Sequence, residues 1–242
     1  MAMDIKGMQK KKRANFKLAG TILIFFAFTL LTTPFFSGVC KGEPLPGKSL
    51  DRLLEDVEKK FSRIKTVKTE LTQEKNIALF SETVISKGFC IFKAPEKLRL
   101  EFTSPFKSSL VINGPKVAKY EFYNGKWRKL DSVNKEILLL VTKNISSWLK
   151  GRFKDPGTYD MRAYKDQGIT IVLKPRNDEF KKFISSFELR LNKELNGLEE
   201  IVINETKKNF TKIKFHNNRV NEEIPETVFS DSGERPSEVL SW

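Results

Sequence analysis

The sequence predicts a mainly β (α+β) fold, an incomplete antiparallel β-barrel of about 10–11 strands with a lid of short α-helices. Apolar and polar residues alternate with a period of two over most of residues 66–215, as in half-buried strands. Asn-Gly pairs, which favour tight hairpins, separate several of these runs. Only two stretches follow the period of a helix, one before the β-rich part and one within it.

The N-terminus has the features of an export signal. A basic region (Lys6–Lys17) precedes an uncharged run of 14 residues (Leu18–Leu31), and the small residues Ser37 and Gly38 follow. The run is shorter than the about 20 apolar residues that a membrane-spanning helix needs. Residues 1–40 are therefore predicted to be a cleaved signal peptide.

Cys40 is a candidate for lipidation because it directly follows the export signal. Val39 stands at the position where lipoprotein processing usually requires a small residue, so ordinary cleavage near Cys40 or Gly42 is the alternative. Cys90 is the only other cysteine, which excludes a disulfide framework in the mature chain.

The mature part is long enough for one domain and is basic. The whole chain has a net charge of +14, and removal of residues 1–40 leaves 38 basic and 29 acidic side chains, a net charge of +9. Such a surface favours anionic lipid head groups or acidic proteins as partners. Nucleic acid is not expected as a partner of an exported protein.

The first element is a helix. Residues 41–48 contain two prolines and two glycines and are predicted to form an irregular linker. Ser49 is a suitable N-cap for an amphipathic helix over Leu50–Ile64, whose apolar face includes Leu53, Val57 and Phe61.

The strands follow, with a second helical region, Val133–Phe153, inserted among them and a polar tail at residues 230–242. Gly88 marks a bend, and Asn113-Gly114 and Asn124-Gly125 mark hairpin turns. The predicted strands are Thr66–Thr72, Thr83–Phe92, Leu98–Thr103, Ser108–Ile112, Val117–Tyr123, Lys126–Leu130, Tyr159–Tyr164, Ile169–Leu173, Lys182–Leu191, Leu198–Asn204 and Asn209–Phe215.

No motif supports catalysis, a metal or a cofactor. Gly42–Ser49 matches the P-loop pattern, but it lacks the preceding buried strand, and two prolines remove N–H donors that would bind phosphate. His216 is the only histidine, so a zinc site or a Ser-His-Asp triad has too few members. The chain is predicted not to be an enzyme.

The segment Gly88–Ile112 (GFCIFKAPEKLRLEFTSPFKSSLVI), followed by Asn113-Gly114 and Val117–Tyr123, resembles the outer-membrane lipoprotein carrier family, LolA. Three further pieces resemble the family in the same order along the chain: Phe61–Gln73, Ile169–Pro175 and Phe210–Glu226. The resemblance covers about Leu50–Phe229 and implies a carrier domain over residues 49–229.

The resemblance also implies a function and partners. A periplasmic monomer would take lipoproteins by their acyl chains from an inner-membrane ABC-type release complex and deliver them to an outer-membrane lipoprotein acceptor. The implied cavity residues are Leu98, Leu100, Phe102, Ile112, Tyr120, Phe122, Trp127, Trp148 and Leu149, and the implied lid or rim residues are Leu53, Val57, Phe61, Ala94, Pro95, Ile137 and Phe153. A packed core made of the same apolar side chains is the alternative.

One departure from the family affects the lid. The family often has an arginine directly before the turn proline, where it fastens the lid by hydrogen bonds, but this chain has Ala94 before Pro95. We therefore expect different lid control, with Lys93 as a candidate. Two other functions remain open: an anchored acceptor or lipid sensor on the same fold, and a secreted hydrolase or polyanion-binding module.

Overall fold

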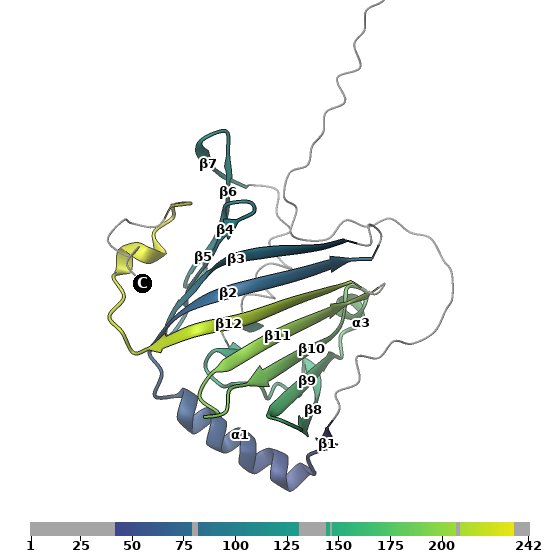
Figure 1. Cartoon of the computed structure of the whole chain (residues 1–242). Coiled ribbons are helices and arrows are strands. Elements are labelled where there is room, and N and C mark those ends of the chain that lie inside the picture. The colour runs from purple at the N-terminus through teal and green to yellow at the C-terminus, as the bar shows by residue number, and fades with distance from the viewer. Residues whose placement is uncertain (1–41, 79–81, 131–143, 146, 207–208, 235–242) are drawn as a thin grey trace, which may run out of the picture. The chain divides into compact units, whose positions relative to one another are not determined.

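An antiparallel sheet dominates the computed structural model, which describes residues 42–78, 82–130, 144–145, 147–206 and 209–234. The strand order is β1-β8-β9-β10-β11-β12-β2-β3-β4-β5-β6-β7, so β1 and β7 are edges and the sheet is not closed (Figure 1). The predicted incomplete barrel is confirmed, with 12 strands in the described residues. The strands are β1 (Glu43–Pro44), β2 (Thr66–Ile77), β3 (Glu82–Lys93), β4 (Lys97–Ser104), β5 (Ser108–Asn113), β6 (Lys116–Tyr123), β7 (Lys126–Lys129), β8 (Tyr159–Lys165), β9 (Ile169–Pro175), β10 (Ile184–Leu191), β11 (Leu198–Glu205) and β12 (Phe210–Val220).

The pairing register places apolar side chains on one face of the sheet, which we call the inner face. A continuous row of cross-strand neighbours crosses six strands on this face, and every member is buried. A shift of one residue in any strand would turn its apolar side chains to the other face, so this pattern fixes the register. The row runs through Ala163, Ile171, Leu189, Ile201, Ile213 and Gln73.

Gly88 lies at a β-bulge where β3 meets β4. The register shifts between Lys87 and Gly88, and a Cβ atom at Gly88 would lie 1.9 Å from the carbonyl oxygen of Glu101. Only glycine permits this approach, and bulges of this kind bend a strand. The bend predicted at Gly88 therefore coincides with a β-bulge.

The start of the domain differs from the prediction. Residues 43–44 of the expected linker form β1, which pairs with β8. Helix α1 (Gly47–Phe61) begins two residues before Ser49, with Pro46 as the N-cap residue. The Pro46 carbonyl accepts a hydrogen bond from the N–H of Leu50 at 2.9 Å, and helix starts tolerate proline because their first N–H groups have no helical partner.

Two boundaries in the second half were also wrong. Residues 182–183 do not belong to β10, because a short helix, α3 (Asp178–Lys181), precedes it. The side chain of Asn177 caps α3 by accepting from the N–H groups of Glu179 and Phe180 at 2.8 and 3.2 Å. Strand β12 continues to Val220 across a bulge after His216.

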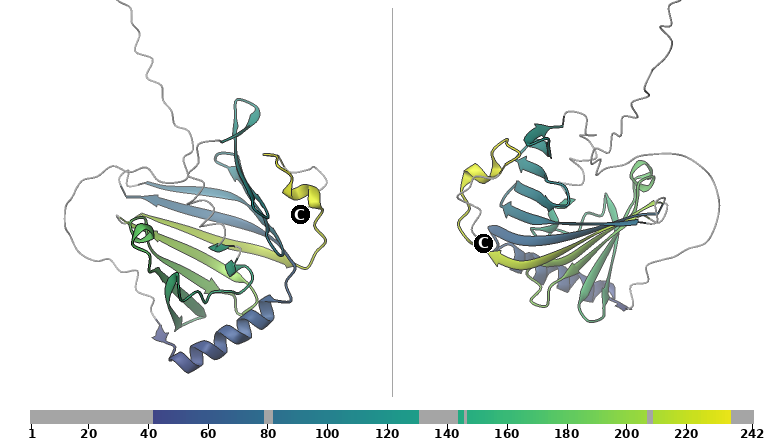
Figure 2. Two further views of the ribbon diagram at one scale, coloured as in Figure 1. Left: turned by 180° about the vertical axis from the view of Figure 1, so that it is seen from behind. Right: turned by 45° about the horizontal axis from the view of Figure 1, so that its top comes forward.

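The described part of the second helical region lies on the inner face. Residues 144–145 and 147–148 are helical, and Trp148, Leu149 and Phe153 are buried in the same cluster as the sheet. We call residues 147–153 the cover segment; Figure 2 shows it against the sheet in the view from behind. Residues 149–153 are not helical, so the predicted helical region up to Phe153 was wrong at its end; Ile137 and residues 133–143 and 146 lie outside the described residues.

The C-terminal segment crosses the opposite face, which we call the outer face. Residues 221–234, the C-terminal strap, include the 3-10 helix η2 (Glu226–Phe229) and pack Ile224, Val228 and Phe229 against Ile91 (Figure 1). The predicted loose tail from residue 230 was therefore wrong up to residue 234, and residues 235–242 lie outside the described part. In the described part of the chain, no helix has the length and apolarity needed to span a membrane.

Candidate functional site

The inner face of β4 and β5 forms an apolar wall. Leu98, Leu100 and Phe102 alternate along β4, and Ile112 of β5 pairs directly with Leu98. Leu98, Phe102 and Ile112 are buried, whereas Leu100 is half-buried. Four of the predicted cavity residues therefore share one face, and this face continues across the sheet into the row of apolar residues on β8–β12.

The cover segment and α1 bury this face by aromatic contacts. The ring of Trp148 packs edge-on against Phe187 of β10, with 4.9 Å between ring centroids. Phe153 meets Phe61 of α1 in the same manner at 5.9 Å. Val57 is fully buried and Leu53 partly buried on the same side of the helix. The predicted lid residues of α1 and Phe153 thus lie together with Trp148 and Leu149.

In the part of the chain that the structure describes, two exposed ion pairs join α1 to the cover segment and to Lys154, the residue directly after it. The Nζ of Lys154 lies 3.0 Å from Asp51, and the Nε of Arg152 lies 3.9 Å from Glu58. All four side chains are well exposed, and exposed ion pairs contribute at most about 1 kcal/mol each. The cover segment is consequently held mainly by apolar burial.

Ala94 and Pro95 have no polar side-chain group to fasten the cover segment, although the charge of Glu96 in the same turn acts on Lys150 of that segment. Ala94 packs against the inner cluster and donates its N–H to the carbonyl of Lys65, and Pro95 is exposed. The suggestion that Lys93 controls the lid was wrong: its Nζ donates to the carbonyl of Ile224 at 2.8 Å and pairs with Glu226 at 2.8 Å, so it binds the C-terminal strap.

A cavity of about 420 Å³ opens where α1 ends. This volume falls within the range of about 300–1,000 Å³ that is usual for small-molecule sites. Apolar side chains form most of its wall, and asparagines form part of its rim. The rim turn is well ordered by Asn192, whose Oδ1 accepts from the N–H groups of Asn196 and Gly197 at 3.0 and 3.2 Å. The lining residues are Phe61, Ile64, Val67, Thr69, Leu149, Asn192, Glu194, Asn196, Gly197, Leu198, Phe215, Asn218 and Val220.

Tyr120, Phe122 and Trp127 do not join this site. In β6, Lys119 pairs with the inward-facing Leu110, so the flanking residues Tyr120 and Ala118 face outward. Phe122 and Trp127 are paired with each other on the same outer side. Because residues in a strand alternate between faces, these three aromatics cannot share a cavity with Leu100. Their assignment to the inner cavity was wrong.

A second cavity, of about 500 Å³, lies on the outer face beside the C-terminal strap. Its wall combines strand residues with Phe229, Ser230 and Asp231 of the strap. Asp231 binds Lys129 at 2.6 Å and accepts a hydrogen bond from the Tyr120 hydroxyl. Hydrogen bonds from Lys129 and Tyr120 lower the pKa of Asp231, whereas burial and Asp231 raise the pKa of Tyr120. This cavity is separate from the inner face.

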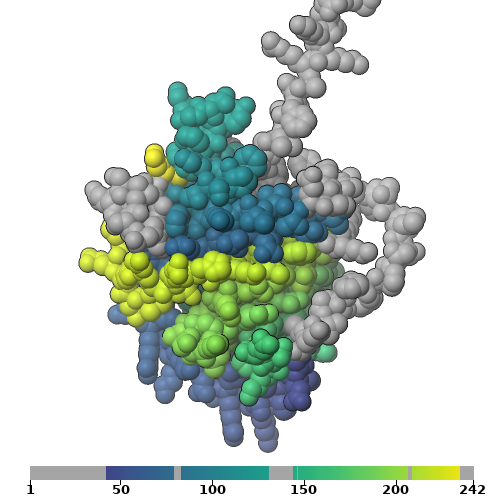
Figure 3. Space-filling view, in the orientation of Figure 1, coloured from purple at the N-terminus to yellow at the C-terminus, as the bar shows by residue number. Residues whose placement is uncertain are grey.

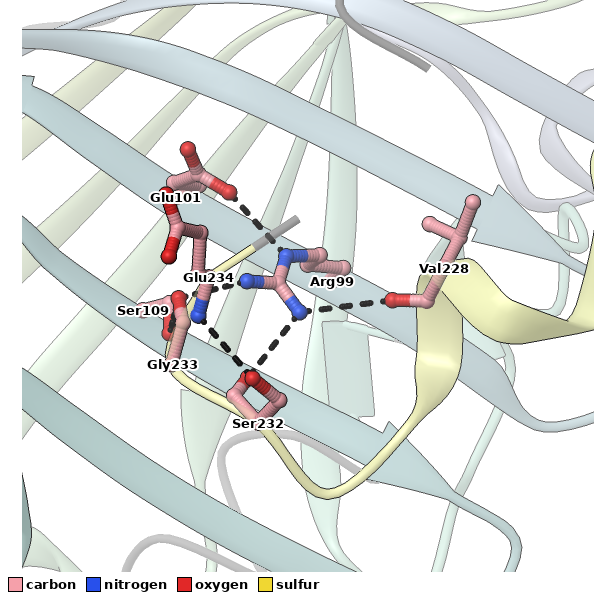
Figure 4. Close-up of polar contacts among 7 residues, drawn as sticks. All are labelled: Arg99, Glu101, Ser109, Val228, Ser232, Gly233 and Glu234. Atoms are coloured by element: carbon pink, nitrogen blue, oxygen red, sulfur yellow. Dashed lines mark hydrogen bonds and ion pairs between the residues drawn. The ribbon is translucent and has the colours of Figure 1, made fainter. Parts of the chain in front are cut away.

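Arg99, on the outer face of β4, binds the C-terminal strap (Figure 4). Its side chain is fully buried, and its Nε lies 3.0 Å from a carboxylate oxygen of Glu101. Its terminal nitrogens donate to the carbonyls of Val228, Ser232 and Gly233 at 3.3, 3.1 and 2.6 Å. The alternating pattern of β4 suggested an exposed polar face here, and the strap covers it instead.

Cys90 and His216 offer no reactive group at the inner site. Cys90 is buried on the inner face, and burial raises the pKa of its thiol to about 12, which keeps it neutral. His216 is exposed at the bulge of β12. Among the described residues, no group of three or more His, Cys, Asp or Glu could hold a metal ion.

The comparisons with known proteins bear on this apolar, covered face. The family model "Outer membrane lipoprotein carrier protein LolA" matches residues 62–232, which is more than half of the chain. The chain belongs to the LolA family. LolA-like proteins in general bind lipids or lipoproteins, are non-enzymatic, and are periplasmic or extracytoplasmic. A search of curated protein sequences found no match.

Several solved structures are similar to part of this chain at low sequence identity. A DUF1329 family protein from Desulfovibrio piger is 10% identical over 76% of this chain and 97% of that one, with a TM-score of 0.44. A LolA superfamily protein from Nitrosomonas europaea is 9% identical over 73% and 97%, with a TM-score of 0.38. In the MucA/MucB complex of Pseudomonas aeruginosa, the match is 14% identical over 72% of this chain and 58% of that one, with a TM-score of 0.43.

Proposed function

We propose that this LolA-family protein is a periplasmic carrier that binds the acyl chains of lipoproteins against the inner face of its sheet. The observation that carries the proposal is the composition of that face. It is mostly apolar from β8 to β5, with Thr69 and Gln73 of β2 as buried polar members, and among the described residues α1 and the short cover segment lie over it rather than a second sheet. A cover of this size can be displaced by a ligand while the sheet stays intact.

The free energy of burying an acyl chain can offset the free energy of exposing the cover segment. Exposing Trp148, Leu149 and Phe153 would cost about 1.5–3 kcal/mol each, or about 5–9 kcal/mol together. Each buried acyl CH₂ group returns about 0.8 kcal/mol, so a single chain of roughly ten carbons offsets the exposure. A lipoprotein with several longer chains would shift the equilibrium towards the open, loaded form.

The cavity at the end of α1 gives the acyl chains a place to enter. Its apolar wall includes Phe61 and Leu149, so it is continuous with the contacts that hold the cover segment. Its asparagine-containing rim suits the uncharged ester and amide groups at the head of a lipoprotein. Loss of Leu149 from the cavity wall would open the cavity towards the inner face.

In the complete proposal, residues 1–40 direct export and are cleaved, and residues 49–229 form the carrier as a monomer. An inner-membrane ABC-type release complex would load it, and an outer-membrane lipoprotein acceptor would unload it. The carrier itself would use no nucleotide, metal or other cofactor. Transfer would follow the relative affinities of the three partners for the same acyl chains.

Leu100→Glu tests the proposed cavity. Leu100 is half-buried on the inner face, so a carboxylate there would oppose acyl binding with limited damage to the fold. Thr103→Glu is the matched control, because Thr103 is exposed on the same strand. Capture of a fluorescent triacylated lipopeptide should fall at least about tenfold in Leu100→Glu only, and equal capture by both folded variants would reject the cavity.

An anchored acceptor or lipid sensor on the same fold is favoured by one feature, Cys40 at the end of the export signal. Mass spectrometry of the protein from its natural host separates the two functions. A diacylglyceryl group on Cys40 would indicate an anchored protein, and a free N-terminus beyond residue 40 would indicate the soluble carrier.

A further inference from the structure

Exposed aromatic and basic side chains gather at the end of the sheet formed by the β4–β5 and β6–β7 turns. Phe106, Phe122 and Tyr123 are 69%, 37% and 59% exposed, which is unusual for side chains of this size. The N–H of Phe122 donates to the carbonyl of Lys107 at 2.9 Å, so the two turns are joined. We call Phe106, Lys107, Phe122, Tyr123, Lys126 and Arg128 the aromatic tip.

The cations of this tip lie on its rings. The Nζ of Lys107 is 5.2 Å from the centre of the Phe122 ring, and the guanidinium of Arg128 is 5.2 Å from the centre of the Tyr123 ring. Exposed apolar side chains that occur singly need no explanation, but here Phe122 and Tyr123 lie on opposite faces of one hairpin, and a cation lies over each ring. The whole β6–β7 hairpin, residues 116–130, has five basic side chains and one acidic side chain.

We propose that the aromatic tip is a docking site for an anionic lipid bilayer. Aromatic rings with a polar edge concentrate at the boundary between head groups and acyl chains, and lysine and arginine reach the phosphates from the same depth. The net positive charge of the hairpin matches the negative charge of such a surface. The ring–cation pairs can enter this boundary together without separating.

The shape of the tip favours a bilayer over a protein partner. In the space-filling view, the teal β6–β7 hairpin projects from the domain as a narrow tip (Figure 3). A stable protein interface buries about 800 Å² on each partner, usually on a broad and complementary surface. A narrow tip presents little such area, yet it can insert three aromatic side chains into a lipid surface that deforms around it.

Protection of an edge strand is the simpler role for the basic residues here. Strand β7 is an edge of the sheet, and lysines protect edge strands from pairing with other chains. That role explains Lys126 and Arg128, but it leaves the exposure of Phe106 and Tyr123 unexplained, since exposed aromatics at an edge promote association. Membrane docking accounts for both the charges and the rings.

The position of the tip has a consequence for the inner site. Because successive strands are antiparallel, the β4–β5 and β6–β7 turns lie at the end of the strands opposite the β3–β4 and β5–β6 turns. The cavity at the end of α1 lies at that opposite end, beside the start of β2 and the end of β12. A domain docked by its aromatic tip would keep this cavity open to the solvent.

A local probe of membrane contact tests the proposal in the full chain. Cys40→Ser removes the cysteine of the leader, and Cys90 is buried, so an introduced cysteine can be labelled selectively. An environment-sensitive NBD fluorophore is attached to Ser104→Cys beside the aromatic tip or, in a second protein, to Ser62→Cys after α1. Both serines are exposed. Because the emission reports only the surroundings of the probe, membrane binding by another part of the chain does not produce the signal.

The expected result is a blue shift and gain of NBD emission at residue 104, and none at residue 62, with phosphatidylcholine vesicles that contain phosphatidylglycerol. Added salt should weaken it. No response at residue 104, an equal response at both positions, or an equal response to phosphatidylcholine alone would overturn the proposal. If the aromatic tip does not bind vesicles but crosslinks to an envelope protein, membrane docking would likewise be overturned in favour of protein docking.

Variants separate the two parts of the tip. Lys126→Gln with Arg128→Gln should lower the affinity for anionic vesicles on the order of thirtyfold, since each basic residue near the surface contributes about 1 kcal/mol. Arg52→Gln with Lys59→Gln, exposed on α1, is the charge-matched control and should leave the affinity within about threefold. Phe106→Ser with Tyr123→Ser should abolish the blue shift, and its persistence would overturn ring insertion.

Discussion

Replacing Arg99 should release the C-terminal strap and destabilise the domain. Arg99→Met retains most of the apolar stem of the side chain while it removes the guanidinium. Three strap carbonyls and the carboxylate of Glu101 then lose the hydrogen bonds that Arg99 donates to them, while the Gly233 carbonyl keeps the one from the Ser109 hydroxyl. Breaking a buried ion pair by removing one partner typically costs about 3–5 kcal/mol, because the other charge stays buried.

Urea unfolding of the full chain measures this loss, and hydrogen exchange locates it. The free energy of unfolding should fall by about 3–5 kcal/mol, a large share of the about 5–15 kcal/mol that is usual for a domain. Amides of the strap should lose protection before those of the sheet. Ser109→Ala removes one hydrogen bond to Gly233 and should cost only about 1 kcal/mol, which gives a milder variant if Arg99→Met does not fold.

Arg190→Met is the matched control for Arg99→Met. Arg190 is 53% exposed and lies 3.9 Å from Glu200, so its loss should cost at most about 1 kcal/mol. The reasoning would be refuted if Arg99→Met lost no more stability than Arg190→Met, or if it left the protection of the strap unchanged.

Three further outcomes are expected. Hydrogen bonds from Lys93 and Lys97 lower the pKa of Glu226 to about 2, so the stability that the ionised carboxylate adds is complete above pH 4.5 and is lost as the pH falls through 2. A pH series of urea unfolding should show this loss in the wild type and not in Glu226→Gln. Identical pH profiles of the two proteins would exclude this role of Glu226. In a Cys40→Ser chain, Cys90 should react with a thiol reagent at pH 8 only when the domain opens, and rapid labelling of the native protein would contradict its burial. Gly88→Ala should destabilise by more than about 1 kcal/mol in thermal unfolding because its methyl group meets the Glu101 carbonyl; an unchanged midpoint would mean that the bulge adapts.

The strands could be predicted from the sequence because a period of two is a local property. Leu98, Leu100 and Phe102 alternate with polar neighbours, and Asn-Gly turns end several runs, so strands β2 to β12 could be predicted, whereas the two-residue β1 was expected to be linker. The faces of β6 could not be predicted in the same way. Which side Tyr120 takes depends on its pairing with Ser109, a contact that the sequence does not encode locally.

The strap was missed because its signal is short and its anchor resembled a surface residue. Arg99 alternates with leucines, as a solvent-facing arginine does, and its burial becomes evident only when the strap is placed. Ile224, Val228 and Phe229 were the available clue, since three apolar residues within six positions need a partner surface.

The start of α1 and the content of the inner face could not be predicted from the sequence, for two different reasons. Helix α1 begins before Ser49 because a preceding proline is compatible with a helix start, and a strong capping residue does not have to be used. The inner face is apolar in the sequence whether it is filled by Trp148 or by a ligand. Only the geometry shows that a short, weakly fastened segment occupies it.

Native mass spectrometry of the exported protein, purified without detergent, tests the proposed carrier function most directly. The proposal expects a bound mass that matches an acylated ligand, uptake of a triacylated lipopeptide by any empty fraction, and the loss of both in Leu100→Glu but not in Thr103→Glu. A bare protein that refuses added lipopeptide, with its fold intact, would contradict the carrier function and leave the apolar inner face as a packed core.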